Sequence, residues 1–324
     1  MKFPTGLIIL FCLFVGEITT AQGFSFDSAY IQSFDKQNNV EFNAGTSRNR
    51  FQFSQIGMNK TGFRMLANTS AYAGVNLSYK WLSLRYSTAV PGTRLDQKTQ
   101  LKYTSLSFTF GTRRWRFRPF YERYNGLLIP GDVPRSYEPF KNIRFTGFGS
   151  DFYWYANPRK YSLRAARSMS EAQLKRAGSL FAIVTPMWQQ INWQQPNPDF
   201  ITDEDTYKLL ASNPSWISVT AQIGYGYNFS LANGKWIVSP IIAAGGGFLK
   251  ETYHIRHRIQ GISLAQALIS GGYNGRKYYC YLSGSWSIQQ SRLLTRKMER
   301  LNTRVSLTAG VRFGDLKKKI LGLL

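Results

Sequence analysis

The segment ISVTAQIGYGYNF at residues 217–229 decides the fold class of this chain. Its odd-numbered side chains are aliphatic or aromatic, whereas its even-numbered positions carry hydroxyl groups, amides or glycine. Such alternation is typical of a β-strand that has one apolar face and one polar face. The run is longer than an ordinary globular strand and matches the length of a tilted strand that crosses a bilayer. The segment therefore predicts a membrane-spanning strand.

The same alternation recurs over most of the chain, most clearly at 278–288 and 301–313. Asn233-Gly234 and Asn274-Gly275 separate alternating segments and are typical of type I′ hairpin turns. Shorter strands are predicted near residues 39–46, 49–56, 69–79, 81–88, 101–110, 114–122, 143–156, 160–168 and 178–187. Together these segments predict an all-β fold, an antiparallel transmembrane β-barrel of about 12 strands (about 10–14), in one domain over residues 22–314.

One helical turn interrupts the strand pattern. Ser170 followed by Gln173 resembles a capping box, and Gly178 is a typical helix terminator, which predicts a short helical turn near 170–177. Long connections are predicted near residues 90–99, 124–142, 189–214, 251–261 and 291–300. Counting strands back from the C-terminus places the 124–142 connection on the periplasmic side, where turns are usually short. We therefore expect one segment between about 157 and 215 to be miscounted.

Both ends of the chain differ from the alternating part. A basic start, an apolar run at 7–15 and the small residues Thr19-Thr20-Ala21 predict a cleaved signal peptide over residues 1–21. No later apolar run is long enough for a transmembrane helix, which excludes a helical membrane protein. Residues 315–324 form a basic-apolar tail, which we interpret as a periplasmic extension. Export and the alternating strands together predict the outer membrane, with a soluble exported protein as the alternative.

The chain is strongly basic, with 41 Lys and Arg against 17 Asp and Glu and a net charge of +24. A charge of this size suggests an anionic partner, which for an outer-membrane protein would be the phosphates of lipopolysaccharide. The candidate binding residues, in the lumen or against anionic lipid, are Arg113, Arg114, Arg116, Arg118, Arg304 and Arg312. Basic and aromatic alternation around Trp115 and Phe117 also suits single-stranded nucleic acid. We expect no nucleic-acid partner, because a signal peptide routes the chain away from nucleic acid.

Aromatic residues make up 15% of the chain, and many lie near predicted strand ends. Membrane barrels concentrate such residues in a girdle at each interface. The predicted interface aromatics are Trp81, Trp115, Trp154, Tyr155, Trp216, Trp236 and Trp286. A soluble β-sandwich core is the alternative, but the adjacent Trp154 and Tyr155 cannot both face one core.

No catalytic or metal site stands out. His254 and His257 would point to opposite faces of a strand, so we interpret them as loop residues. An acidic cluster at Asp199, Asp203, Glu204 and Asp205 lacks the spacing of a calcium loop, and we interpret it as a solvated acidic loop. Cys280 is interpreted as a small strand side chain. No cofactor and no metal is predicted.

Three segments resemble a family of Bacteroidota proteins known as domain of unknown function 4421. They are Asp27–Ile31, Tyr79–Leu84, and the block formed by Tyr161–Ala166 and Gln173–Ser179. The resemblance implies an outer-membrane barrel of similar length. It implies no activity, substrate or catalytic residue.

Three functions fit these patterns. The first is a porin-like or structural barrel with a basic lumen, which would favour anions if it were open. The second is a lipid-modifying enzyme, in which Ser263 or Ser291 would lie near His254 or His257 on outer loops. The third is a non-conducting barrel that binds lipopolysaccharide or a protein partner. All three imply contact with outer-membrane lipid and with the barrel-assembly machinery, and they leave the oligomeric state open.

Overall fold

The computed structural model describes residues 26–36, 38–55, 62–68, 71–79, 82–96, 102–131, 136–194, 201, 203–252, 259–293 and 296–315. Several predictions lie outside the described residues: the signal peptide, Trp81, Asp199, His254, His257 and the tail from 316 to 324.

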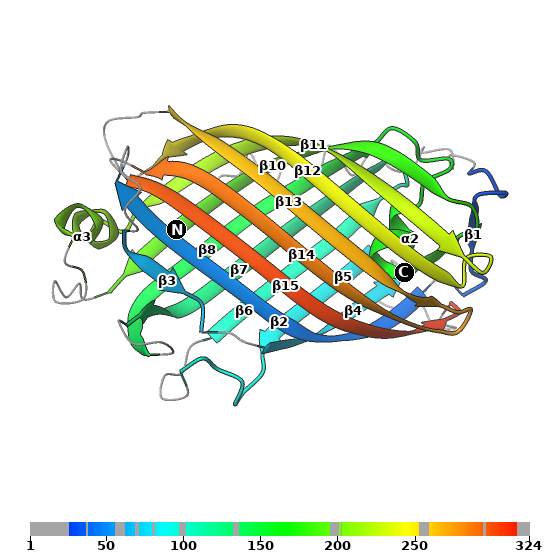
Figure 1. Cartoon of the computed structure of the whole chain (residues 1–324), viewed down its shortest axis with the longest axis horizontal. Coiled ribbons are helices and arrows are strands. Elements are labelled where there is room, and N and C mark those ends of the chain that lie inside the picture. Colours follow the sequence, from blue (N-terminus) through cyan, green and yellow to red (C-terminus); the bar gives the residue numbers. More distant parts are fainter. Residues whose placement is uncertain are drawn as a thin grey trace.

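Within the described residues, twelve long antiparallel strands close into a barrel, which confirms the predicted fold class (Figure 1). They are β2 (Asn38–Gln55), β4 (Ala71–Tyr79), β5 (Leu82–Ala89), β6 (Lys102–Gly111), β7 (Trp115–Pro130), β8 (Tyr137–Tyr155), β10 (Ala177–Trp193), β11 (Ser215–Leu231), β12 (Trp236–Glu251), β13 (Ile259–Asn274), β14 (Tyr278–Leu293) and β15 (Arg296–Phe313). The barrel closes where β15 pairs with β2 along its whole length, from Phe313 opposite Asn38 to Arg296 opposite Gln55. The short strand β3 (Arg64–Leu66) lies between β2 and β7.

The alternation read from residues 217–229 sets which way each side chain of β11 points. Ile223 is 72% exposed on the outer surface, whereas the neighbouring Gln222 is 6% exposed and faces the lumen. The same arrangement holds on β15, where Val305 and Leu307 face outward and Ser306 faces inward. The apolar face of each strand is therefore the outer face, the reverse of a soluble protein.

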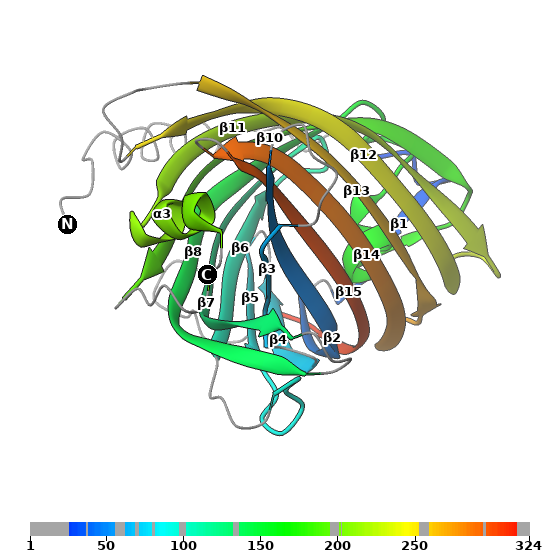
Figure 2. The ribbon, with the colours of Figure 1, turned by 60° about the vertical axis from the view of Figure 1, so that its left-hand side comes forward.

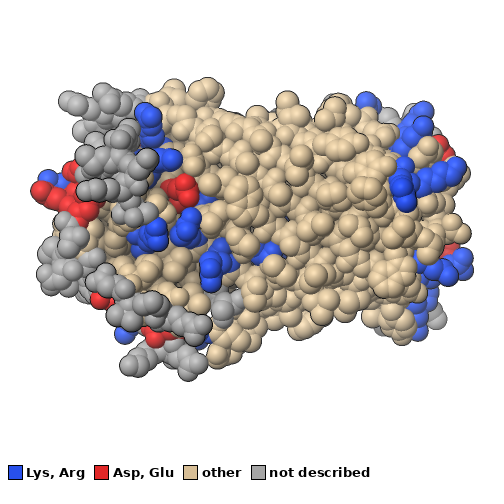
Figure 3. Space-filling view, in the orientation of Figure 1, with Lys and Arg blue, Asp and Glu red and all other residues tan. Residues whose placement is uncertain are grey.

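An uncharged belt surrounds the middle of the barrel. On β15 the outward positions from Leu301 to Val311 carry no charge, and on β11 none from Ile217 to Leu231 does. Figure 3 shows this belt as a tan band, with Lys, Arg, Asp and Glu gathered toward the two ends. A charge-free apolar band around a closed barrel is the surface that hydrocarbon requires, so the fold is that of a transmembrane barrel.

The two ends of the barrel differ, and we name each after the helix that it carries. The α2 end holds the start of β2 at Asn38, the end of β15 at Phe313, and tight turns. At one of these turns Ala232, Asn233 and Gly234 all have positive φ, which confirms the predicted hairpin. The α3 end carries several longer connections and the helix α3 (Glu204–Ala211), whereas the long connection at the α2 end is the one between β8 and β10.

The segment between β8 and β10 corrects two predictions. Residues 160–168 are not a barrel strand: Ser162 caps the helix α2 (Leu163–Ser168) by accepting a hydrogen bond from the Ala165 amide at 3.0 Å. The helical turn predicted near 170–177 is wrong in position, because Glu171–Gln173 forms the short strand β9. Removing the extra strand puts the β7–β8 connection at the α3 end with the other long connections, which resolves the inconsistent count.

Two further corrections concern strand length. The predicted strands 39–46 and 49–56 are one continuous strand, β2. β7, β8 and β10 run well beyond the predicted segments, because inward-facing aromatic residues continue into the α3 end. In the described part of the chain, no helix is long and apolar enough to cross a membrane.

Candidate functional site

The lumen at the α2 end is filled by a plug, which we define as β1 (Ile31–Ser33), α2 and β9. β1 pairs with β9 in a separate two-stranded sheet, with Ile31 opposite Gln173 and Ser33 opposite Glu171. Leu163 and Ala166 of α2 pack against inward-facing residues of the wall, including Phe181 and Ile241. Figure 1 shows α2 and β1 gathered at this end of the barrel, and Figure 2 shows β1 at the end opposite α3 from a second direction. The plug therefore joins the N-terminal segment to the connection between β8 and β10.

Gln173 is the buried centre of the plug. Its side-chain amide donates to the carbonyl oxygens of Tyr30 at 3.1 Å and Lys160 at 2.7 Å. Its side-chain oxygen accepts from the Ser162 amide and from the Asn228 side chain, both at 2.9 Å. Asn228 belongs to β11, so this one glutamine connects three parts of the plug to the barrel wall.

Glu171 carries the negative charge of the plug. Its carboxylate lies 2.7 Å from the Arg113 guanidinium and 3.7 Å from that of Arg164, and it accepts a 2.6 Å hydrogen bond from the Ser162 hydroxyl. Burial by itself would raise the pKa of Glu171, but the Arg164 and Arg113 charges and the hydrogen bonds outweigh it and hold the pKa below its usual range. Glu171 is therefore ionised at neutral pH and pins the turn after β6 to the plug.

Arg312, near the end of β15, secures the plug from the opposite side. It is 2% exposed and donates to the carbonyl oxygens of Met169 and Gly275 and to the Asn274 side chain. Its guanidinium stacks between Phe34 at 3.8 Å and Tyr279 at 4.2 Å from the ring centroids. Planar stacking combined with several donors is a geometry that arginine provides and lysine does not.

The middle of the lumen contains charged groups that are paired with one another. Arg118 on β7 bonds the Asp151 carboxylate on β8, which also accepts from Thr185 on β10 at 2.7 Å. Arg300 and Glu122 form a two-bond ion pair with distances of 2.7 and 2.9 Å. These contacts neutralise two of the inward-facing arginines, one of which, Arg118, belongs to the predicted set.

A further buried carboxylate lies inside the barrel nearer the α2 end. Glu41 on β2 accepts from Asn76 at 2.9 Å and from the Tyr279 hydroxyl at 3.0 Å, with Arg85 at 3.8 Å. Asp151 thus connects β8 to its two neighbouring strands, Glu41 connects β2 to β4 and β14, and Glu122 connects β7 to β15.

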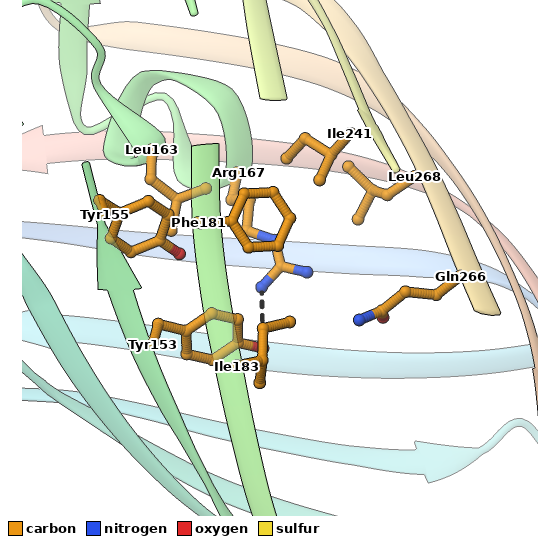
Figure 4. Close-up of a pocket in the computed structure, with 9 residues that line it drawn as sticks. All are labelled: Tyr153, Tyr155, Leu163, Arg167, Phe181, Ile183, Ile241, Gln266 and Leu268. Carbon is orange, nitrogen blue, oxygen red and sulfur yellow. Dashed lines mark hydrogen bonds between the residues drawn. The ribbon is translucent and has the colours of Figure 1, made fainter. Parts of the chain in front are cut away.

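A small pocket lies between α2 of the plug and inward-facing residues of the wall (Figure 4). Arg167 of α2 projects into it and donates to the Tyr153 hydroxyl at 3.4 Å. It is lined by Tyr153, Tyr155, Leu163, Arg167, Phe181, Ile183, Ile241, Gln266 and Leu268. Most of this lining is aromatic or aliphatic, and its polar groups are the Arg167 guanidinium, the Gln266 amide and the hydroxyls of Tyr153 and Tyr155.

An apolar cluster, which we call the apolar cap, lies inside the barrel at the α3 end. Its buried members come from β2, β3, β6, β7, β8, β10, β11, β12, β13, β14 and β15 as well as from α3. Trp216 at its centre is fully buried, and its indole N–H donates to Gln189 at 3.0 Å. Leu209 and Leu210 bring α3 onto the cluster, and Arg296 pairs with Asp203 at the start of the helix. The barrel therefore has its own hydrophobic core at this mouth.

The predicted arginines face the lumen or lie in the turn at its α2 mouth rather than on the outer wall. Arg113 contacts Glu171, Arg118 contacts Asp151, and Arg304 donates to the Tyr103 hydroxyl at 3.2 Å. Arg116 shares the inward face with Arg118 because it is opposite the buried Tyr153. Arg114 lies in the turn before β7, and its carbonyl accepts from the Tyr155 amide. Their placement gives no support to direct lipid contact by this set.

The predicted interface aromatics divide into two groups. Trp115, Trp154 and Trp236 lie at the α2 end of their strands, and Trp154 is 48% exposed on the outer surface. The prediction is wrong for Tyr155, which is 2% exposed, and for Trp216, because both face the lumen and form part of the interior packing. Trp286 faces outward but lies mid-strand on β14 opposite Thr303, away from either rim.

The candidate catalytic serines lie on opposite faces of the wall. Ser291 is buried and is opposite the inward Ile262, whereas the next residue, Ser263, is exposed on the outside. The wall separates the two hydroxyls, so a site could use only one of them, and the predicted partners His254 and His257 lie outside the described residues. Within the described residues, no group of three His, Cys, Asp or Glu side chains is placed to hold a metal ion.

The acidic cluster is more ordered than the solvated loop that we predicted. Asp203 caps α3 by accepting from the Thr206 amide at 3.1 Å, and both Asp203 and Asp205 pair with Arg296. Glu204 and Asp205 are exposed as predicted, and Glu204 pairs with Lys208 along the helix.

Sequence reasoning missed the buried carboxylates and Gln173. The available signal was an acid at a polar position of an alternating strand, as in Glu41 between Asn39 and Asn43. In a chain with 17 acidic and 41 basic residues, an inward-facing acid is surrounded by arginines that need a partner.

A family described as a domain of unknown function (DUF4421) matches residues 25–313. The chain belongs to this family. No curated protein matches the chain.

Solved structures of outer-membrane barrels resemble this DUF4421 barrel at low sequence identity. The Escherichia coli outer membrane protease OmpT is 7% identical with a TM-score of 0.38, over 88% of this chain and 100% of that one. The β domain of the Bordetella autotransporter BrkA is 13% identical with a TM-score of 0.40, over 86% and 100%. The Pseudomonas putida toluene transporter TodX is 8% identical with a TM-score of 0.30, over 91% and 100%. At these values the likeness carries no conclusion about activity.

Proposed function

We propose that this DUF4421 protein is an outer-membrane barrel of a Gram-negative bacterium, as its resemblance to Bacteroidota sequences implies. In this proposal its lumen is closed and its role is binding or structural. The observation that carries the proposal is the apolar cap, because its buried residues come from nearly the whole circumference of the barrel. Ions need a continuous water path, and a dry apolar constriction does not provide one.

The α2 end supports the same conclusion independently. The plug is held by Gln173, Glu171 and Arg312, each of them buried and bonded to the plug, the wall or both. A pore would need both closures to open together. The inward arginines Arg118 and Arg300 are paired with carboxylates, so they do not form the free positive lining that an anion pore uses.

The proposed orientation follows from the connections. Outer-membrane barrels have short periplasmic turns and longer outer loops. By this rule the α2 end faces the periplasm, because it has both barrel termini and tight turns, and its one long connection, between β8 and β10, folds into the lumen. The α3 end then faces the cell exterior, and α3 is displayed there on top of the apolar cap.

The experiment is single-channel conductance of the purified full chain in planar bilayers, after heat-modifiable gel migration has shown that the barrel is folded. We expect no stable open level. A control barrel of known conductance, reconstituted in the same way, shows that insertion is efficient. A steady current with anion preference would overturn the proposal and favour the porin-like function instead.

A further inference from the structure

The outer surface at the α3 end carries a basic patch that the sequence patterns did not single out. We define this patch as Arg48 and Arg50 on β2, Arg64 on β3, Arg292 on β14 and Lys297 on β15. Figure 3 shows Lys and Arg gathered at this end of the near face, over β2, β14 and β15 and beside the tan belt. The arginines and the lysine face away from the lumen, unlike the six that we predicted.

Strand register places these side chains in two groups, with Arg48, Arg50 and Arg64 on one side of Glu299 and the Arg292 and Lys297 pair on the other. Arg292 is directly opposite Lys297, Arg50 is opposite Leu301, and Arg48 is opposite Thr303. Arg64 is opposite Gln52, one outward position along β2 from Arg50. Directly opposed side chains in a sheet are about 5 Å apart, and alternate positions along one strand are about 7 Å apart. Neighbouring members of the patch can therefore reach one multivalent anion.

The patch has far more positive than negative charge. Glu299 is the acid between its members, and its two oxygens are engaged by Arg50 at 3.5 Å and by Gln290 at 3.1 Å. Arg48, Arg64 and Arg292 are exposed, and no ion pair to them is found within the part of the chain that the structure describes. The positive side chains of the patch repel one another. An anion bound between them therefore lowers this electrostatic repulsion energy.

Below the patch the wall is suited to acyl chains. Leu301 adjoins Arg50 across the sheet, and along β15 the exposed Val305 and Leu307 follow it into the belt. A ligand at this height needs an anionic head beside the arginines and an apolar tail along the barrel. A free anion satisfies only the first requirement, whereas a phosphorylated lipid of the surrounding leaflet satisfies both.

We infer that the Arg48, Arg50, Arg64, Arg292 and Lys297 patch is a binding site for the phosphorylated headgroup of an outer-leaflet lipid of the lipid A type. The inference rests on the proposed function, which sets the α3 end in the outer leaflet. It names the partner class of the closed barrel and the surface that receives it.

The test is native mass spectrometry of the full chain in mild detergent, titrated with bis-phosphorylated lipid A and, separately, with dephosphorylated lipid A. A basic residue near an anionic lipid surface contributes about fivefold in binding. We therefore expect the phosphorylated lipid to be retained at least about tenfold better than the dephosphorylated one, and the R48Q/R50Q/R292Q/K297Q variant to lose that preference. E299Q removes the competing acid and should raise retention by about twofold to fivefold.

The matched control is R123Q/R144Q. These arginines also lie toward the α3 end, on β7 and β8, where both donate to Asn125 at 3.0 Å. This variant should keep the preference. Equal loss of the preference in the control would mean that general surface charge holds the lipid. Equal retention of both lipids, or a four-residue variant that keeps the preference, would mean that there is no phosphate site. Each of these results overturns the inference.

Folding and function are kept separate from this readout. Every variant is first checked by heat-modifiable migration, and if the four-residue variant fails to fold, R48Q/R292Q and E299Q test the inference with opposite expected signs. Lipid retention does not depend on conductance. A barrel that conducts but keeps the lipid preference overturns the proposed function alone, whereas a silent barrel without the preference overturns the lipid site alone.

Discussion

The carboxylate of Glu171 and the guanidinium of Arg113 meet at 2.7 Å, which ties β9 inside the lumen to the turn between β6 and β7. The two residues are 58 positions apart in the sequence. Glu171 is 2% exposed as a side chain and Arg113 is 20% exposed, so the contact lies at the inner edge of the α2 mouth. The plug sheet of β1 and β9 is separate from the sheet of the barrel wall. The ion pair therefore connects the plug to this part of the wall through side chains.

Glu171→Gln should loosen the plug without unfolding the barrel. The change leaves Arg113 and Arg164 without their counter-charge, and loss of one member of a buried ion pair costs a few kcal/mol. Because Arg113 retains some water, we expect a fall of about 2 kcal/mol in the free energy of unfolding, measured by urea titration in lipid vesicles. Glu204→Gln on α3 is the control, since both partners of its ion pair are exposed, and no measurable change is expected. Equal stability of the two variants would contradict a structural role for Glu171.

The plug should also respond to acid in a defined direction. The pKa of Glu171 in the folded protein lies below its usual value of 4.5, despite burial, because of Arg164, Arg113 and the hydrogen bonds. Its ionised form therefore stabilises the folded state fully above the ordinary glutamate pKa, and this contribution is lost as the pH falls through the lowered value. The protection factors of the plug amides in hydrogen exchange should stay high as the pH falls to the ordinary glutamate range and should decrease below it. In Glu171→Gln this step should disappear, and its persistence would assign it to another group.

Arg312→Lys should be poorly tolerated although it keeps the charge. Lysine cannot stack between Phe34 and Tyr279, and its single ammonium cannot reach Met169, Gly275 and Asn274 together. Breaking a buried network that leaves carbonyl oxygens unpaired costs about 1–3 kcal/mol for each group lost, so we expect about 3 kcal/mol in urea unfolding. Arg276→Lys in the adjacent turn serves as the control, and a loss of the same size there would contradict the assignment.

The barrel itself could be predicted from the sequence because its strands obey a local rule. Alternation over 217–229 determines which face of β11 meets lipid, and the described structure places Ile223 outside and Gln222 inside as that rule requires. The same alternation predicts the direction of Trp216, which shares the face of Ser218 and therefore points inward. The interface prediction for Trp216 rested on its position near a strand end and not on the alternation of side chains.

The plug could not be predicted, because nothing local to it separates helix from strand. Residues 161–166 are apolar at spacings that fit either structure, and short apolar runs do not settle the question. What decides it is tertiary: Gln173 bonds the carbonyl of Tyr30, which is 143 positions away, and Asn228 on β11. A capping-box pattern at Ser170 competed with the true cap at Ser162, whose hydroxyl also bonds Glu171.

Opening a conducting path through the lumen should require changes at both the apolar cap and the plug. Trp216→Ala removes the largest buried side chain of the apolar cap and leaves Gln189 without its indole partner. We expect a loss of about 4 kcal/mol in urea unfolding, the usual cost of a large aromatic truncated in a core. Conductance should stay silent in Trp216→Ala alone, because the plug still closes the α2 end. Combined with Glu171→Gln, it should produce brief openings in planar bilayers. The control is Trp236→Ala with Glu171→Gln, because Trp236 is outward-facing and 52% exposed, and this pair should stay silent. A full-size current from Trp216→Ala alone would show that the plug does not seal the lumen.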